Sequence, residues 1–228
     1  MKAVVYCATR NLYQDMLPSL KSLLIHNTLD KVYLLIEDDA FPYYLPTVCE
    51  TINVSGQQFF GADCPNLGNS WTWMVLMRAA LPFIFPNLDR ILSLDCDTIV
   101  TDDITELWDL DISNHYFAAC REPLTSAGGA YYKQPLYCNV GVAMYNLAKM
   151  RDDGVAAEVI ELLNHKRLPF VEQDALNEVC QSAILPISAK FNKCDYTEPV
   201  GYAKITHFAG IKDWARNPLV REYARRSF

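Results

Sequence analysis

Residues 90–97, Arg-Ile-Leu-Ser-Leu-Asp-Cys-Asp, decide the fold of this chain. A strand is predicted over 90–95, and its centre, Ile91-Leu92-Ser93-Leu94, is mainly apolar, which is typical of a strand buried in a sheet. Asp95 and Asp97 stand at its carboxyl end, where open α/β sheets bind their ligands. Carboxylate oxygens there can converge on a hard divalent cation, which in turn can neutralise a phosphate leaving group. The stretch therefore predicts a buried strand that ends in a metal site.

The sequence before this strand alternates strands and helices. Apolar and β-branched runs predict three strands, over 3–8, 31–37 and 51–55. Leucines at helical spacing predict a helix near 16–24, and a second helix is expected over 71–81, stopped by Pro82. This order favours an α/β fold whose sheet is mostly parallel and covered by helices.

The second half of the chain is less regular. Further strands are expected over 116–120, 137–145 and 204–208, and helices around 155–163 and 173–180. The glycine-rich segment 125–130, TSAGGA, predicts a mobile loop. We find no linker and expect one domain over 1–215, followed by a short basic tail, 216–228. Five basic side chains against two acidic ones over 212–228 favour a solvated tail, with at most a peripheral role at a membrane.

Composition narrows the class of protein. A chain of 228 residues, 51% hydrophobic and 21% charged, can bury a substantial core. A net charge of -7 argues against a protein that grips nucleic acid by its phosphates. The longest uncharged stretch, 134–148, is too short to cross a membrane, and the opening residues lack a signal-peptide pattern. The eight cysteines form no CxxC pair, so we expect free thiols and a cytoplasmic location.

The Asp-Cys-Asp motif by itself has other interpretations. A pair of aspartates can simply form a turn, and Asp109-Leu110-Asp111 is predicted to be surface of this kind. An apolar strand running into residues 95–99 also resembles the first motif of haloacid-dehalogenase-type phosphatases, in which Asp95 would be the nucleophile and Asp97 the general acid/base. That family places its nucleophile near the start of the domain and adds a later strand ending in paired acids. Neither feature is present here. Without the later paired acids, the phosphatase hypothesis lacks the residues that would complete its metal site.

Three further motifs complete the pattern, namely YCNVGVAMYNL at 137–147, EQDALN at 172–177 and KITHFAG at 204–210. Together with the DxD motif, and in this order, they closely resemble glycosyltransferase family 8. The resemblance runs from the first strand to Trp214. It implies a retaining, metal-dependent enzyme of the GT-A fold, a single Rossmann-like domain with a mostly parallel mixed central sheet flanked by helices.

The resemblance also implies roles for individual residues. Asp95, Asp97 and His207 match the family's metal ligands for Mn2+ or Mg2+. Lys212 resembles a lysine that contacts the diphosphate, although it stands one residue closer to His207 than is usual. The remaining donor-binding positions are Ala8, Thr9, Asn11, Arg78, Cys96, Asn139 and Gly210. Thr9 or Arg10 stands where the family often has an aspartate. Glu172 and Gln173 match residues around the donor sugar, and with Asp174 they are the candidate catalytic residues.

The expected reaction is transfer of a hexose, glucose or galactose, from a UDP-sugar to a saccharide or another hydroxyl acceptor. Retention requires either a double displacement or attack on the face from which the leaving group departs. We favour same-face attack, in which the leaving phosphate helps to deprotonate the acceptor, because Gln173 is an amide and Glu172 or Asp174 could equally orient sugar hydroxyls. The alternative from another class is a non-catalytic module of the same fold that binds a nucleotide sugar or saccharide without turnover.

Overall fold

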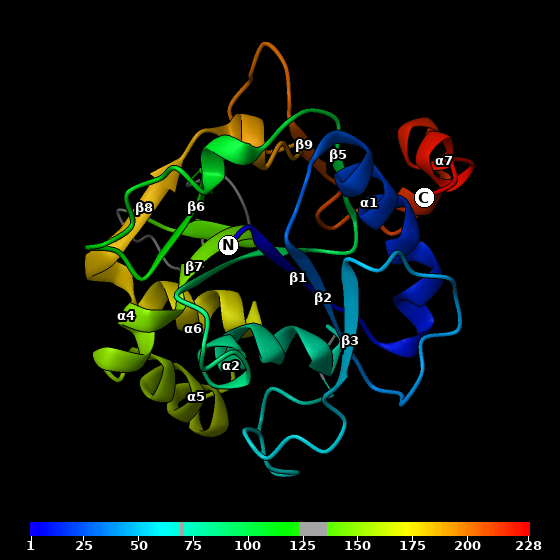
Figure 1. Cartoon of the computed structure of the whole chain (residues 1–228). Coiled ribbons are helices and arrows are strands. Elements are labelled where there is room, and N and C mark those ends of the chain that lie inside the picture. Colours follow the sequence, from blue (N-terminus) through cyan, green and yellow to red (C-terminus); the bar gives the residue numbers. More distant parts are fainter. Residues whose placement is uncertain (69–70, 124–135) are drawn as a thin grey trace.

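A computed structural model describes residues 1–68, 71–123 and 136–228, so the glycine-rich segment 125–130 lies outside the described residues. A seven-stranded sheet with the order β3-β2-β1-β4-β7-β6-β8 forms its centre (Figure 1). Its strands are β1 (Ala3–Cys7), β2 (Lys31–Ile36), β3 (Cys49–Asn53), β4 (Arg90–Leu94), β6 (Phe117–Arg121), β7 (Cys138–Asn146) and β8 (Ile184–Ile187).

The direction of strand β7 determines which strand ends meet at the edge of the sheet that carries the candidate site residues. The β3-β2-β1-β4 half is parallel, and β8 is parallel to β6, whereas β7 runs antiparallel to both β4 and β6. The carboxyl ends of β4 and β6 therefore meet the amino end of β7. Two backbone bonds mark this edge: Asp95 N–H donates to Gly141 C=O over 2.7 Å, and Glu122 N–H donates to Tyr137 C=O over 2.8 Å. The prediction of a mostly parallel mixed sheet is confirmed.

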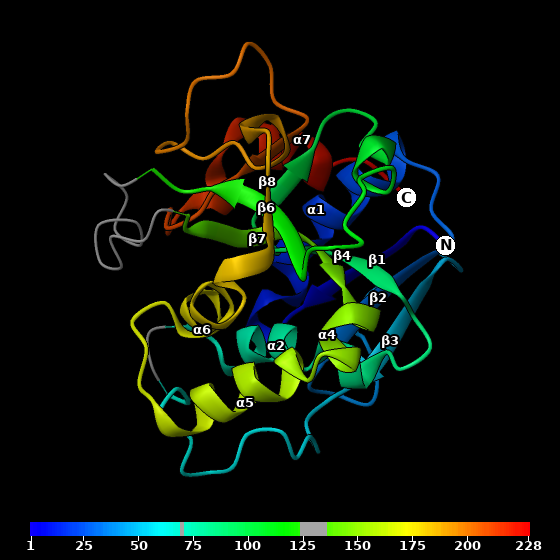
Figure 2. The ribbon, with the colours of Figure 1, turned by 90° about the vertical axis from the view of Figure 1, so that its left-hand side faces the viewer.

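Helices cover both faces of the sheet (Figures 1 and 2). Helices α2 (Met77–Ile84), α4 (Leu147–Asp152), α5 (Val155–His165) and α6 (Val171–Val179) lie on one face, and α1 (Tyr13–His26) with α7 (Pro218–Ala224) lies on the other. Strand residues alternate between two apolar cores because successive side chains point to opposite faces. In β1, Val5 packs with the α2 and α5 side, and Val4 and Tyr6 pack with the α1 side.

The helix expected over 71–81 differs from the prediction. It begins as a 3-10 turn, η2 (Trp73–Leu76), and continues as α2 through Pro82 to Ile84. The prediction that Pro82 stops the helix is wrong. A proline removes one backbone N–H and crowds the carbonyl four residues earlier, which weakens a helix without necessarily ending it. Here the helix ends two residues later, and its last turn already lies at the edge of the core.

The structure contains short elements that were not predicted, among them strand β5 (Thr98–Val100). It pairs antiparallel with β9 (Ile205–His207), which lies within the strand expected over 204–208, and the two form a separate two-stranded ribbon. Strand β8 lies at the edge of the main sheet and contains Pro186, which fits an edge strand because proline cannot donate to a second neighbour. The remaining 3-10 turns are η1 (Arg10–Leu12), η3 (Thr105–Leu107), η4 (Gln181–Ala183), η5 (Ala189–Phe191) and η6 (Trp214–Arg216).

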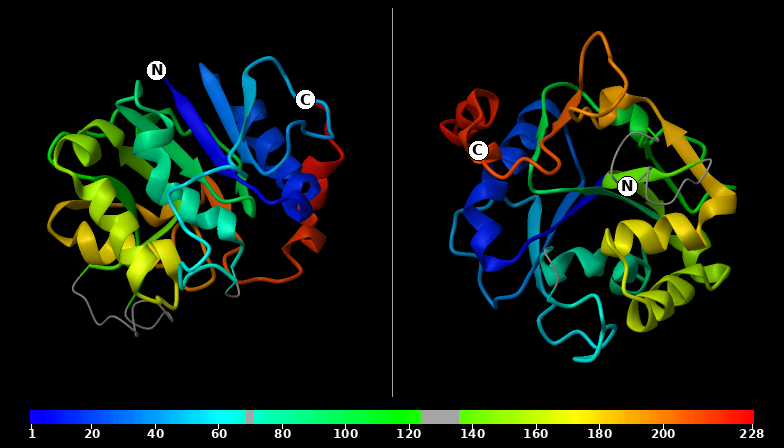
Figure 3. Two further views of the ribbon diagram at one scale, coloured as in Figure 1. Left: turned by 90° about the horizontal axis from the view of Figure 1, so that it is seen from below. Right: turned by 180° about the vertical axis from the view of Figure 1, so that it is seen from behind.

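The C-terminal segment is part of the packed structure. Helix α7 lies along α1, as the views from below and from behind both show (Figure 3). Val220 and Tyr223 are buried with Ile99 and Phe208, and the Tyr223 hydroxyl lies 2.8 Å from Nε2 of His26. The expectation of a solvated tail is therefore wrong for these residues, because their apolar surface is removed from water. No helix within the described ranges has the length and apolar character needed to cross a bilayer.

Candidate functional site

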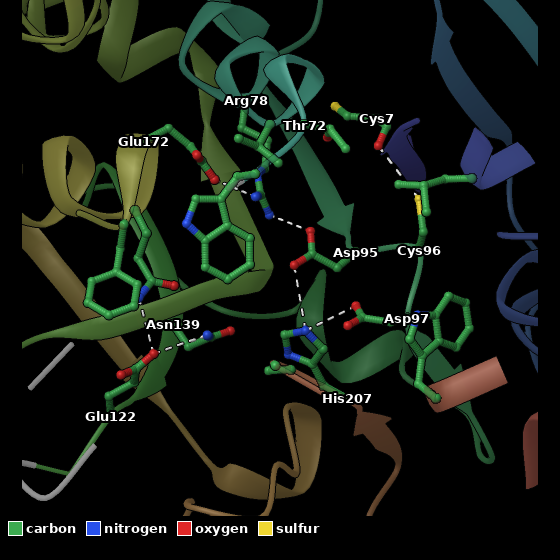
Figure 4. A pocket seen from close by; sticks show the side chains of 18 of the residues that line it. Cys7, Thr72, Arg78, Asp95, Cys96, Asp97, Glu122, Asn139, Glu172 and His207 are labelled. Atoms are coloured by element: carbon green, nitrogen blue, oxygen red, sulfur yellow. Dashed lines mark hydrogen bonds and ion pairs between the residues drawn. The ribbon is translucent and has the colours of Figure 1, made fainter. Parts of the chain in front are cut away.

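A cavity of about 420 Å3 opens at the edge of the sheet where β4 and β6 end and β7 begins (Figure 4). Residues from many segments line it. They include Cys7 at the end of β1, Thr72 just before η2, Arg78 in α2, and the Asp95-Cys96-Asp97 motif after β4. Glu122, Asn139, Glu172, Gln173 and His207 complete its polar wall, and the aromatic rings are Trp71, Phe170, Tyr196 and Trp214.

Asp95, Asp97 and His207 converge in this cavity. Nε2 of His207 lies 3.2 Å from Oδ1 of Asp97 and 3.5 Å from Oδ2 of Asp95. One ligand atom from each residue falls within a mutual distance of 4.8 Å. The β5–β9 ribbon explains the approach, since it pairs His207 with Thr98, and Phe208 N–H donates to Asp97 C=O over 2.9 Å. The DxD turn and the histidine are thus held side by side by backbone pairing.

Gly141 forms the floor beneath these three side chains. A Cβ at this position would lie 2.2 Å from Cε1 of His207 and 2.7 Å from Oδ2 of Asp95, closer than atoms can approach. The glycine of the 137–147 motif therefore leaves the space that lets both ligands reach one point. Two carboxylates and one imidazole form a donor set that suits Mn2+ or Mg2+, with oxygen ligands preferred by both ions. The side chains of Asp95, Asp97 and His207 could therefore hold a divalent cation.

A buried arginine neutralises the acids on the other side of this cluster. The guanidinium of Arg78 is paired with the carboxylates of both Asp95 and Glu172, as Figure 4 shows. Burial acts to raise the pKa of Asp95, but the charge of Arg78 and the imidazole of His207 overcome it and lower the pKa to about 2. Glu172 is more deeply buried, and burial outweighs the same arginine and raises its pKa to about 7. One guanidinium is shared by two acids, and the less exposed acid keeps its proton more readily.

A second polar cluster lies beside Asp95, Asp97 and His207. Oε1 of Glu122 accepts hydrogen bonds of 3.1 Å from Nδ2 of Asn139 and from Nε2 of Gln173. Oε1 of Gln173 in turn accepts from the backbone N–H of Val140 over 3.2 Å. The Tyr196 hydroxyl accepts from Nδ2 of Asn139 over 3.1 Å. The cluster presents a carboxylate, two amides and a phenol to the cavity, which is the chemistry of a site for hydroxyl-rich ligands.

Comparisons with known proteins agree with this geometry. The family model of glycosyl transferase family 8 matches residues 4–217. The chain belongs to glycosyl transferase family 8. A putative glycosyltransferase of Haemophilus influenzae is 29% identical over 123 residues, which cover 50% of this chain and 37% of that protein. Glycosyltransferase GlyE of Streptococcus pneumoniae is 26% identical over 206 residues, 84% of this chain and 47% of that protein. The chain thus spans less than half the length of these curated relatives.

Solved structures show the same fold. The crystal structure of GlyE from Streptococcus pneumoniae aligns with a TM-score of 0.73 at 20% identity and covers 99% of this chain and 60% of that one. The galactosyltransferase LgtC, solved with donor and acceptor sugar analogs, aligns with a TM-score of 0.73 at 18% identity and covers 97% of this chain and 95% of that one. These likenesses confirm the GT-A fold. Family membership supports a glycosyltransferase and removes the phosphatase alternative.

The residues predicted to bind the nucleotide of a family 8 donor lie at the carboxyl end of β1. Ala8 and Thr9 are buried and Asn11 is exposed; Oγ1 of Thr9 donates to Oδ1 of Asn11 over 2.7 Å. Among the described residues, these three do not line the cavity, whereas Cys7 and Leu12 on either side of them do.

The loop after His207 supplies the remaining predicted contacts. Gly210 lines the cavity and has a φ of 76°, a left-handed conformation that favours glycine. Lys212 is exposed and is absent from the described cavity wall, although Gly210 and Trp214 on either side of it belong to that wall. Cys96 lines the cavity, and its thiol lies 3.6 Å from the carbonyl oxygen of Cys7. Asp109 and Asp111 are exposed, as predicted.

The three candidate catalytic residues occupy different positions on α6. Glu172 and Gln173 line the cavity, but Asp174 does not belong to its described walls. Asp174 accepts hydrogen bonds from the Tyr137 hydroxyl and, over 2.7 Å, from the backbone N–H of Phe170, so it fixes the start of the helix. Val171 just before them has a φ of 52°, which is a strained conformation for a β-branched residue.

Glu122, Asn192 and Tyr196 are site residues that were not predicted. Glu122 could have been found, because it directly follows β6, whose carboxyl end lies on the same edge as that of β4. Asn192 and Tyr196 lie in an irregular segment between η5 and β9, outside every motif. No sequence signal marks them.

Proposed function

We propose that this chain is a retaining glycosyltransferase that transfers a hexose from a UDP-sugar to a hydroxyl acceptor with the help of a divalent cation. The observation that carries the proposal is the convergence of Asp95, Asp97 and His207 next to a buried Arg78 in a cavity with a polar wall. A volume of about 420 Å3 lies within the range of ordinary small-ligand sites. Glucose and galactose remain the proposed sugars, and a saccharide the proposed acceptor.

The metal site would be formed by Oδ atoms of Asp95 and Asp97 and by Nε2 of His207. When bound, Mn2+ or Mg2+ would supply the positive charge that stabilises a diphosphate leaving group. The protein is acidic overall, with a net charge of -7, and Arg78 is already committed to two carboxylates. Exposed Lys212, on the loop after Gly210, is the proposed further cationic contact for the diphosphate.

The cluster of Glu122, Asn139 and Gln173 would orient the sugar. Its amides have fixed orientations because each is hydrogen-bonded to a neighbour, so the cavity is arranged before any ligand enters. Glu172 is held by Arg78, Gln173 is an amide and Asp174 caps the helix. These commitments support same-face attack by the acceptor, in which the departing phosphate oxygen takes the proton of the acceptor hydroxyl.

The deciding experiment is release of UDP from a panel of UDP-sugars with and without Mn2+. We expect Mn2+-dependent release with UDP-glucose or UDP-galactose. Asp97→Asn should reduce it by about 100-fold or more, the scale of losing one group that stabilises developing charge. Asp109→Asn is the matched control, because it changes an exposed aspartate of the second Asp-x-Asp sequence. Full activity of Asp97→Asn without added metal would contradict the mechanism.

The non-catalytic module is distinguished by the same panel. A sugar that stabilises the protein in a Mn2+-dependent thermal shift, with no release of UDP in the presence of saccharide acceptors, would favour binding without turnover.

A further inference from the structure

Asn192 lies next to the candidate metal site and hydrogen-bonds to two residues of the sequence motifs, His207 and Asn139. Its side chain is fully buried, directly after η5. Oδ1 of Asn192 is 2.8 Å from Nδ1 of His207, on the ring edge opposite the one that faces the two aspartates. Nδ2 of Asn192 is 2.9 Å from Oδ1 of Asn139. The side-chain amide of Asn192 therefore links His207 to Asn139 of the polar cluster.

The identity of each atom in this chain of bonds follows from the backbone. The N–H of Gly141 lies 3.0 Å from the side chain of Asn139, and because a backbone N–H can only donate, the atom facing it is Oδ1. That same oxygen faces Asn192, so Asn192 presents its NH2 group there and its oxygen to His207. A carbonyl oxygen only accepts, so Nδ1 of His207 carries the hydrogen.

The second amide of the cluster is fixed independently and agrees. The N–H of Val140 donates to Oε1 of Gln173, which leaves Nε2 of Gln173 to donate to Glu122. Nδ2 of Asn139 donates to the same oxygen of Glu122. In each of these hydrogen bonds between Glu122 and His207, a donor faces an acceptor. Two consecutive backbone N–H groups of β7 therefore set the orientation of every side chain between Glu122 and His207.

With a hydrogen on Nδ1, the neutral imidazole would present the lone pair of Nε2 to a cation bound between it, Asp95 and Asp97. We propose that Asn192 is a positioning residue: it holds His207 in the Nδ1–H form as an Nε2 metal ligand, and it couples that ligand to Asn139. Partners of this kind fix the tautomer and the ring orientation of metal-binding histidines. The Cys194 thiol lies 3.6 Å from Nδ1 of His207 and 3.6 Å from Oδ1 of Asn192. The inference rests on the proposed metal-dependent function.

The test is a Mn2+ titration of the full chain followed by electron paramagnetic resonance of free Mn2+. Asn192→Ala should raise the dissociation constant by about 10- to 100-fold, as loss of a hydrogen-bond partner of a metal ligand does. Asn192→Asp keeps an oxygen that accepts from Nδ1, so its affinity should stay within about 3-fold of wild type. The same variant places an oxygen against Oδ1 of Asn139, so we expect KM for the donor to rise about 10-fold while Mn2+ binding is retained.

Asn27→Ala is the matched control for the loss of a buried amide. Asn27 is equally committed to hydrogen bonds, from Ile104 N–H and to the carbonyls of Leu23 and Asp102, and it lies away from the cavity. It should bind Mn2+ as wild type does. Unchanged Mn2+ affinity of Asn192→Ala, or equal loss in Asn27→Ala, would overturn the positioning role and leave the proposed function standing. A wild-type chain that binds no Mn2+ would overturn both.

Discussion

Two polar regions of the molecule differ in how their groups are held. At the carboxyl ends of β1 and β2, a region that we call the β1–β2 edge (residues 8–11 and 37–38), Arg10 forms an exposed ion pair with Asp38, and its N–H donates to Glu37 over 2.7 Å. In the second polar cluster, Glu122, Asn139 and Gln173 are buried and hydrogen-bonded to one another, and the buried Asn192 is hydrogen-bonded to Asn139. Burial makes every one of these bonds obligatory, whereas water can replace the partners of an exposed ion pair.

Removal of the buried Arg78 should have the largest effect on stability. Arg78→Met leaves the carboxylates of Asp95 and Glu172 without their common cation. We expect the free energy of unfolding to fall by about 3–5 kcal/mol, the usual cost of breaking a buried ion pair from one side. Urea denaturation measures it. Adding Glu172→Gln to Arg78→Met should restore part of the lost stability, since one of the two uncompensated acids is then removed. If Arg78→Met alone lowers the free energy of unfolding by less than about 1 kcal/mol, the arginine is not structurally required.

A second prediction concerns the pH dependence that Glu172 introduces. The folded protein holds a proton on Glu172 up to a pKa of about 7, whereas the unfolded chain releases it near 4.5. The stabilisation from this group is therefore complete below pH 4.5 and is lost as the pH rises through 7. Wild type should lose about 3 kcal/mol relative to Glu172→Gln over this window, at about 1.4 kcal/mol per pKa unit. A stability difference between the two proteins that is constant from pH 4.5 to 8 would contradict the raised pKa.

Gly141→Ala tests how closely the metal ligands are packed. The new Cβ would overlap both His207 and Asp95, so we expect a loss of about 1–3 kcal/mol in stability and at least about 10-fold weaker Mn2+ binding. Gly56→Ala is the control, because nothing lies within 4 Å of a Cβ at that position. Calorimetry with Mn2+ gives both quantities. Equal Mn2+ binding by the two variants would show that Mn2+ binding does not depend on the space that Gly141 leaves beneath His207 and Asp95.

The smallest effect is expected at the β1–β2 edge. Arg10→Ala removes an ion pair in which the arginine side chain is 72% exposed, so the midpoint of urea unfolding should stay close to that of wild type. The Asp38 carboxyl should respond more visibly: hydrogen bonding to Arg10 lowers its pKa, and the variant should titrate at higher pH in NMR spectra. A large loss of stability in Arg10→Ala would remove the contrast between the β1–β2 edge and the polar cluster.

Much of the fold could be predicted because its strands are apolar runs with clear boundaries. The strands around Val5, Leu34 and Leu92 and the metal triad are predicted from local patterns and motifs. The continuation of the helix through Pro82 and the packing of α7 could not be predicted from the sequence. Both depend on contacts with neighbouring elements and not on local conformational preference. Glu122 was missed although it directly follows a strand, whereas Asn192 was missed because its partner Asn139 is remote in the sequence.

The sequence alone determined which chemistry was available: carboxylates at a strand end, a histidine before a glycine, and amides at a helix start, each set by local residue types. Only the tertiary structure decided which of them meet. The antiparallel β7 brings Gly141 under Asp95, the β5–β9 ribbon places His207 beside Asp97, and burial obliges Asn139 and Asn192 to pair. The reason is physical. A motif fixes the type of donor or acceptor, but its orientation depends on the partners that a buried polar group is required to find.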